Sequence, residues 1–191
     1  MQELKDRIVK EGRVLPGNII KVDGFLNHRV DMQLLRNMAK EFYRFFGDKG
    51  VTTVMTVEAS GIALAAVTAE EFGVPLLFAK KAKSDNIEGG LVKSEIFSYT
   101  YKKKVTLLVS AEWLSSSDRV LVVDDFMANG EAIRGLIEIV NQVGATPVGV
   151  GIAVEKGFQG GGDRLRAQGL DVKSLAIIDS AEPGNIVFRE E

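Results

Sequence analysis

Apolar residues along this chain follow two alternating patterns. Short, unbroken apolar runs have the length of buried strands, and they occupy residues 51–57, 75–79, 120–123, 147–154 and 172–178. Between several of them, apolar residues recur at the spacing of an amphipathic helix, at residues 62–72, 131–143 and 163–168. This alternation predicts an α/β protein with a mainly parallel sheet that is flanked by helices.

Two segments fall outside this alternation. Residues 1–50 combine a short amphipathic helix with a second helix whose amino terminus Asp31 is expected to cap. Residues 84–117 contain two β-rich runs, at 91–101 and 105–112, which together predict a long hairpin. A hairpin of this length within a compact domain is often a lid, so this segment is expected to form a flap.

The junction between the strand at 120–123 and the following helix carries the clearest candidate chemistry. Asp124 and Asp125 follow the strand at its carboxyl end, where open α/β sheets usually bind ligands. Small residues then lead to Glu131, the expected start of a helix whose first amides have no partner within the helix. A phosphate suits such amides, and two adjacent carboxylates suit sugar hydroxyls or hydrated Mg²⁺. Ordinary turn and cap chemistry is the alternative interpretation.

Composition and charge exclude several classes of protein. The chain has 191 residues, 46% of them hydrophobic, which fits one compact domain with a sizeable core. A formal net charge of −2 argues against nucleic acid or an anionic membrane as the main partner. The chain has no cysteine, which excludes disulfides and thiolate metal sites. No apolar run is long enough to span a bilayer, so a cytoplasmic location is expected.

The whole stretch from Val120 to Gly135 resembles a known signature. An apolar strand, an acidic pair, two variable residues and a small-residue loop resemble the phosphoribosyl-pyrophosphate (PRPP) motif of the type I phosphoribosyltransferases. Asn129 stands where that motif usually has Thr, and Ala132 where Thr or Ser is common. The sequence A-N-G-E-A is similar to the corresponding sequence in the branch of the family that acts on xanthine. The resemblance implies a type I phosphoribosyltransferase fold, with residues 1–191 as one domain, a hood from residues 1–50 and a flap from 84–117.

The resemblance also implies site residues and ligands. Asp124 and Asp125 would be the catalytic residues that hold the ribose hydroxyls. The other implied contacts are grouped by the part of the substrate that they meet: Ala128, Asn129, Gly130, Glu131 and Ala132 for the phosphate of PRPP, Ala59, Ser60 and Lys81 for pyrophosphate, and Ile20, Asn27 and Lys156 for the purine. Mg²⁺ would be held mainly by PRPP rather than by the protein. A mobile catalytic loop is implied near Ser98 and Tyr99.

Each of these positions also has a plain structural interpretation. Ile20 suits the core, Asn27 suits a turn, and Ser60 suits a helix cap. Lys81 belongs to a group of lysines, with Lys80 and Lys83, that could be a solvated basic turn.

Lys156 indicates the class of base. An ammonium group only donates hydrogen bonds, so it favours the exocyclic oxygen of a 6-oxopurine over the amino group of adenine. A lysine that merely caps a turn is the alternative. Asn27 could present either its carbonyl or its amide to position 2 of the purine, so the preference for xanthine rests on the resemblance.

The predicted function is the transfer of ribose 5-phosphate from PRPP to xanthine, which gives XMP and pyrophosphate in purine salvage. The expected partners are PRPP and xanthine, without nucleic acid or membrane, and the family implies a homodimer. Three alternatives are left open: a hypoxanthine- or guanine-preferring enzyme, a PRPP-binding transcriptional regulator without transfer activity, and a nucleotide-hydrolysing domain. The regulator would need a DNA-binding module that residues 1–50 do not supply, and a hydrolase would need the phosphate-binding G-x-x-x-x-G-K-[ST] motif, which the sequence lacks.

Overall fold

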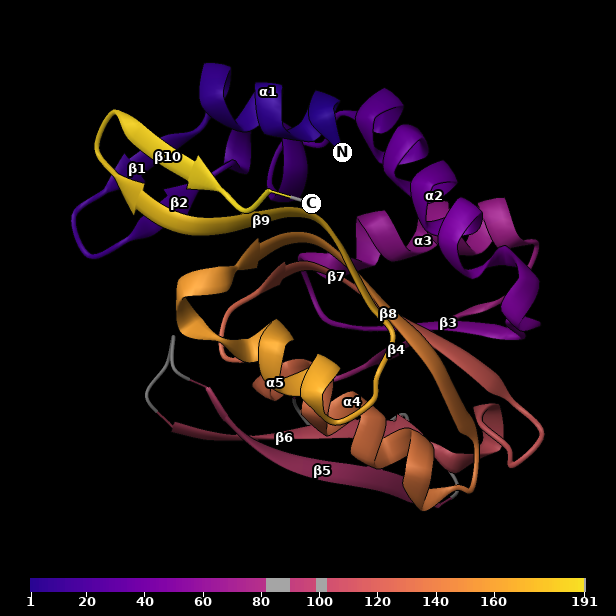
Figure 1. Ribbon diagram of the computed structural model, residues 1–191. Helices are drawn as coiled ribbons and strands as arrows, with labels where there is room; N and C mark the ends of the chain where they lie inside the picture. Colours follow the sequence, from indigo (N-terminus) through magenta and orange to yellow (C-terminus); the bar gives the residue numbers. More distant parts are fainter. Residues whose placement is uncertain (82–89, 99–102, 191) are drawn as a thin grey trace.

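A twisted six-stranded sheet forms the centre of the molecule (Figure 1). The computed structural model describes residues 1–81, 90–98 and 103–190. Within them the strand order is β10–β9–β8–β7–β3–β4, and β10 alone pairs antiparallel to its neighbour. The strands are β3 (Thr53–Val57), β4 (Leu76–Ala79), β7 (Arg119–Met127), β8 (Thr146–Lys156), β9 (Val172–Glu182) and β10 (Asn185–Phe188). The predicted α/β class with a mainly parallel sheet is confirmed.

Helices cover both faces of this sheet, as Figure 1 shows. The covering helices are α2 (Met32–Phe46) and α3 (Gly61–Phe72) on one face, and α4 (Glu131–Gln142) with the short α5 (Gly161–Ala167) on the other. Side chains of β7 alternate between the two resulting cores. Leu121 and Val123 pack with α2 and α3, whereas Val120 and Val122 pack with α4. Because both faces are covered, a strand in the middle of the sheet needs an unbroken apolar run.

The amino-terminal elements begin beside β9 and β10, with the first helix above these strands in Figure 1, and continue to α2, which packs on α3. They comprise α1 (Gln2–Glu11), a hairpin of β1 (Arg13–Leu15) and β2 (Ile19–Lys21), a π-helical turn (Asp23–Asn27) and α2. The expected cap of α2 is present: Asp31 Oδ1 accepts hydrogen bonds from the amides of Gln33 (3.0 Å) and Leu34 (3.1 Å). Strand β1 carries too little apolar pattern to be predicted from the sequence.

The predicted hairpin consists of β5 (Leu91–Ser98) and β6 (Lys103–Ser110), which pair antiparallel. Reciprocal 2.9 Å hydrogen bonds between the backbones of Lys80 and Leu108 connect β6 to the end of β4. The hairpin therefore lies next to the carboxyl edge of the sheet. Lys83, Tyr99 and residues 84–89 of the proposed flap lie outside the described residues.

Two elements differ from the expectation. Strand β7 continues through the acidic pair to Met127, because Phe126 and Met127 still pair with Val154 and Glu155 of β8. Beyond the turn that follows β9, the chain adds the edge strand β10. The division into one domain with a hood and a flap stays a prediction. Among the described residues, no helix is long and apolar enough to cross a membrane.

Candidate active site

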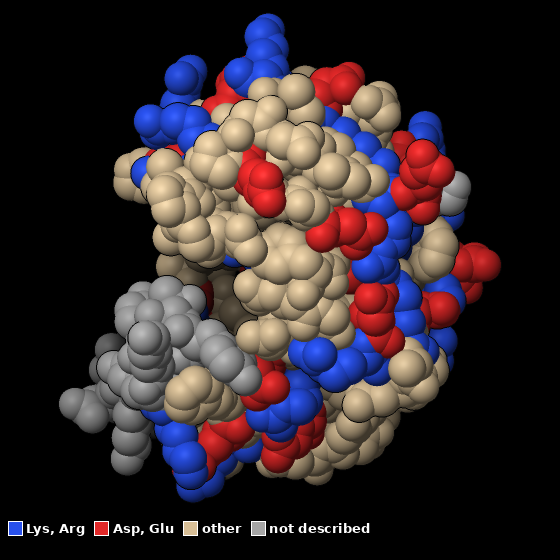
Figure 2. All heavy atoms as spheres, turned by 60° about the vertical axis from the view of Figure 1, so that its left-hand side comes forward, with Lys and Arg blue, Asp and Glu red and all other residues tan. Residues whose placement is uncertain are grey.

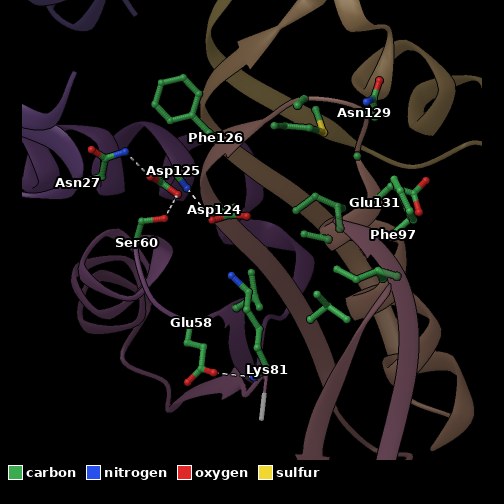
Figure 3. A pocket seen from close by; sticks show the side chains of 18 residues that line it. Asn27, Glu58, Ser60, Lys81, Phe97, Asp124, Asp125, Phe126, Asn129 and Glu131 are labelled. Atoms are coloured by element: carbon green, nitrogen blue, oxygen red, sulfur yellow. Dashed lines mark hydrogen bonds between the residues drawn. The ribbon is translucent and has the colours of Figure 1, made fainter. Parts of the chain in front are cut away.

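A cavity of about 310 Å³ opens at the carboxyl ends of β3 and β7. Figure 2 shows a hollow in the surface of the molecule, and Figure 3 shows the side chains around the cavity. The predicted site residues that line it are Asn27, Ser60, Lys81, Asp124, Asp125, Ala128, Asn129, Gly130, Glu131 and Ala132. Folding therefore gathers segments that are far apart in the sequence around one cavity.

Asp124 and Asp125 form the floor between these segments. Both side chains are buried, with exposed fractions of 6% and 3%. Burial raises the pKa of Asp124 well above its usual value, and the neighbouring charge of Asp125 raises it further, while the charge of Lys81 opposes the rise. Asp124 Oδ1 accepts a 2.9 Å hydrogen bond from the backbone amide of Asp125. The two adjacent carboxyls thus have different environments.

Asp125 is held from two sides, as the dashed lines in Figure 3 show. Its Oδ2 accepts a 2.9 Å hydrogen bond from Nδ2 of Asn27, and its Oδ1 accepts a 2.9 Å hydrogen bond from Oγ of Ser60. Ser60 makes no capping hydrogen bond to α3; its hydroxyl donates to Asp125 instead. Asp125 therefore joins the amino-terminal turn, the β3–α3 turn and the end of β7.

The loop before α4 ends in a glycine with a left-handed backbone conformation. Gly130 has φ of +78°, a conformation that disfavours other residues, and it caps α4 without a side-chain hydrogen bond. The Arg134 amide makes the first hydrogen bond of the helix, to the Gly130 carbonyl at 2.8 Å. The amides before Arg134 have no partner within the helix, and they lie at the positive end of the helix dipole. The binding of a phosphate by this loop stays a prediction.

The β3–α3 turn and the end of β4 lie close together across the cavity. A cis peptide bond joins Glu58 to Ala59, and the Glu58 carboxylate accepts a 2.6 Å hydrogen bond from the Lys81 amide. Figure 3 shows Glu58 and Lys81 together below Ser60. Ser60 and Lys81 line the cavity, whereas Ala59 is an exposed residue of the turn and is not among the lining residues.

The two remaining predicted purine contacts lie outside the cavity lining. Lys156 is half-buried at the end of β8, with Nζ 3.5 Å from the Asn18 carbonyl oxygen and 6.0 Å from the centre of the Phe126 ring. Burial lowers the pKa of Lys156. Ile20 on β2 is 7% exposed and belongs to the core, in agreement with the plain interpretation of this residue. The contact of either residue with a purine stays a prediction.

Several lining residues are not among those predicted from the sequence pattern. Phe126 lines the cavity, and its ring centre lies 6.0 Å from Lys156 Nζ; its position directly after Asp125 could have marked it. Ile96, Phe97 and Val105 come from the β5–β6 hairpin, and no local pattern shows against which part of the sheet a hairpin packs. Among the described residues, no group of three or more His, Cys, Asp or Glu side chains is arranged to hold a metal ion.

Comparison with known proteins agrees with this geometry. Residues 22–183 match the phosphoribosyl transferase domain family. The chain is 52% identical over 190 residues to a protein of Ruminiclostridium cellulolyticum named xanthine phosphoribosyltransferase, with 100% of both chains covered. It is 50% identical over 192 residues to a protein of the same name from Bifidobacterium adolescentis, with 99% of this chain and 100% of the other covered.

Solved structures show the same fold. The adenine phosphoribosyltransferase of Giardia lamblia, in complex with 9-deazaadenine, superimposes with a TM-score of 0.76 at 22% identity, covering 91% of this chain and 96% of that one. The enzyme of Rhodothermus marinus gives 0.74 at 20% identity, with 93% and 99% covered. A domain match over most of the chain, full-length relatives and a shared fold all coincide with a cavity that is lined by an acidic pair and by the loop of residues 128–132. The chain belongs to the phosphoribosyltransferase family.

Proposed function

We propose that this chain transfers the 5-phosphoribosyl group of PRPP to xanthine, which yields XMP and pyrophosphate. One observation supports this most: Asp124 and Asp125 share a cavity with the loop 128–132, as sugar-phosphate recognition requires. The choice of xanthine among the 6-oxopurines rests on the full-length relatives of that name, and the lysine at position 156 supports a 6-oxopurine over adenine.

The cavity offers a distinct environment to each part of PRPP. The 5′-phosphate would bind the amides of residues 128–132, where the positive end of the α4 dipole favours an anion. The ribose hydroxyls would face Asp124 and Asp125, whose carboxylates accept hydrogen bonds. The pyrophosphate would extend towards the turn at Ala59 and Ser60 and the charge of Lys81. These roles are proposals that the arrangement of the cavity supports.

In the transfer, the bond between ribose C1 and a pyrophosphate oxygen breaks, a purine nitrogen forms the new bond to C1, and the proton of that nitrogen leaves to the pyrophosphate or to water. Positive charge develops on the ribose in the transition state, as in glycoside chemistry. No general base stands out among the lining residues, so orientation and electrostatic stabilisation would provide most of the rate. Lys81 would stabilise the negative charge of the departing pyrophosphate.

Mg²⁺ would arrive bound mainly to PRPP. The donor set fits this role, because the protein offers the carboxylates of Asp124 and Asp125, and among the described residues it has no larger group of metal ligands. When bound, Mg²⁺ would neutralise charge on the pyrophosphate. Asp125 would then orient the ribose while Asn27 and Ser60 hold its carboxylate in place.

The base would lie between Phe126, Lys156 and Asn27. The Lys156 ammonium would donate to the oxygen on C6 of xanthine, and this contact would reject adenine, whose C6 amino group is also a donor. Sites that hydrogen-bond their ligand can reject a mispaired analogue by about 10⁴-fold or more. The long 3.5 Å contact of Lys156 with Asn18 leaves the ammonium able to bind a ligand.

The test is an initial-rate comparison of xanthine, guanine, hypoxanthine and adenine with PRPP and Mg²⁺. We expect the highest kcat/KM with xanthine and almost no reaction with adenine. A preference for guanine or hypoxanthine would move the enzyme to another branch of the family, and a preference for adenine would refute the role of Lys156. Negligible transfer with all four bases, together with specific DNA binding, would favour the regulator instead.

We also propose the homodimer that the family resemblance implies. Light scattering on the purified chain would measure its mass directly, and a monomer at all concentrations would refute it.

A further inference from the structure

The glycine-rich segment that precedes α5 packs against the outer side of the phosphate loop. A methyl group on Gly161 would lie 2.7 Å from the carbonyl carbon of Asn129 and 2.7 Å from the amide nitrogen of Gly130, and it would overlap the Ala128 carbonyl oxygen. Contacts this short do not occur, so only glycine allows the two backbones to approach so closely. Position 161 is therefore restricted by the loop and not by its own backbone conformation.

A second contact joins the same two segments. Arg164 Nη2 donates a 3.0 Å hydrogen bond to the carbonyl oxygen of Asn129. Because residues three apart lie on the same face of a helix, Gly161 and Arg164 both face the loop. Neither residue lines the cavity. They therefore contact the loop outside the cavity that a ligand would occupy.

Helix α5 is itself firmly anchored. Glu155 at the end of β8 has an exposed fraction of 0%, and its carboxylate accepts hydrogen bonds from Arg166 (3.0 and 2.7 Å) and from Ser174 Oγ (2.5 Å). Gly162 lies directly against this carboxylate. Arg189 adds ion pairs to Asp163 at the start of the helix and to Asp179 on β9. The segment thus connects the loop to two strands of the sheet.

We propose that Gly161 and Arg164 are positioning residues that fix the phosphate loop in the conformation that binds the 5′-phosphate of PRPP. This inference rests on the proposed function. The loop lacks a side-chain cap at Gly130, so its amides depend on contacts from outside the loop to keep their direction. The backbone of Gly161 limits how far the loop can retreat, and Arg164 holds the Asn129 carbonyl away from the anion.

The inference predicts a defect confined to one substrate. In Gly161→Ala the new methyl group displaces the loop, and a shift of about 1 Å in a positioned group can reduce activity by about 100-fold, so KM for PRPP should rise by about 10-fold or more. In Arg164→Ala, the lost hydrogen bond is exposed to solvent and would act on the anion only through the loop, so KM for PRPP should rise by about three- to ten-fold. KM for xanthine should change by less than about two-fold in both variants, because the loop does not contact the base.

The experiment measures both KM values, kcat and Tm for these variants, together with binding of Mg²⁺–PRPP by calorimetry. Arg164→Lys is the rescue variant, because a lysine can still donate to the Asn129 carbonyl. Gly47→Ala and Arg44→Ala are matched controls at the exposed end of α2. The three atoms nearest to a methyl group on Gly47 would all belong to the ring of the exposed residue Tyr43, and Arg44 forms an exposed ion pair with Glu41.

The possible results distinguish a failure of the positioning role from a failure of the proposed function. A rise in KM for PRPP alone, weaker PRPP binding and partial recovery in Arg164→Lys would support the inference. If the wild-type chain binds and uses PRPP but Gly161→Ala matches it, or loses only Tm and active fraction at unchanged KM, the inference is overturned and the proposed function stands. If the wild-type chain does not bind PRPP, both are wrong.

Discussion

Replacement of Lys156 by methionine separates the function of this residue from its contribution to stability. Methionine keeps much of the length and apolar stem of lysine but removes the ammonium group. In the wild-type chain this group donates a long hydrogen bond to the Asn18 carbonyl oxygen, at 3.5 Å, and burial lowers its pKa. The charge therefore adds little to the stability of the protein. It would add much more to the binding of a base with an oxygen on C6.

The size of the effect follows from these contacts. A hydrogen bond that involves a charged group contributes about 1.5–3 kcal/mol, which corresponds to a loss of about 10- to 150-fold in kcat/KM for xanthine. Since the folded-state pKa of Lys156 lies below its unfolded value, the unfolded chain binds more protons between these two values, and the free energy of unfolding rises with pH across that alkaline window. At neutral pH the charge is present in both states, and its burial opposes folding. Lys156→Met should therefore unfold at the same Tm as the wild type or at a higher one.

The assay compares initial rates with the four purines and thermal unfolding at neutral pH. Lys40→Met, on the exposed side of α2, controls for the loss of one positive charge. We expect xanthine, guanine and hypoxanthine to lose activity while discrimination against adenine weakens. A variant that keeps its kcat/KM for xanthine within about two-fold would refute the role of Lys156, and a large fall in Tm would refute the argument from burial.

Three further predictions concern the buried charges. Asp124→Asn combined with Asp125→Asn should abolish turnover while circular dichroism stays native; normal turnover would contradict the role of the acidic pair. Because the pKa of Asp124 is raised in the folded state, this carboxyl contributes stability at low pH that is lost as the pH rises through the folded pKa. The stability of Asp124→Asn relative to wild type should thus be greater at pH 8 than near its usual pKa of 3.8, as denaturant titrations at a series of pH values would show; a constant difference would speak against the raised pKa. Arg166→Ala should reduce the free energy of unfolding by about 3–5 kcal/mol by leaving Glu155 buried and unpaired, and the double variant with Glu155→Gln should recover part of this loss.

Much of the fold follows from local sequence pattern. The run at 120–123 is apolar on both sides because β7 contributes to two cores. An unbroken apolar run of this kind can be recognised in the sequence alone. The cap of α2 by Asp31 and the glycine before α4 are equally local. Each of these features depends on residues within a few positions of one another, so a one-dimensional pattern contains the information.

The contacts within the site depend on distant parts of the chain, and a pattern cannot show them. Asn27 and Asp125 are 98 positions apart, and no local feature links them. The position of Ser60 suits a helix cap, yet its hydroxyl binds Asp125, because the β3–α3 turn and the end of β7 meet only after the sheet has formed. Likewise, two acidic residues after a strand resemble the start of a loop, although pairing with β8 keeps them within β7.

Asp125 shows why such contacts matter for the proposed reaction. Its carboxylate is buried, and a buried charge needs hydrogen bonds that compensate for lost solvation. Asn27 provides one from the side of the proposed base, and Ser60 provides the other from the side of the proposed pyrophosphate. The group that would bind the ribose is therefore oriented by the two segments that would bind its substituents. Because an enzyme gains rate when its polar groups are fixed before the substrate arrives, these two hydrogen bonds would contribute to catalysis without touching the reacting atoms.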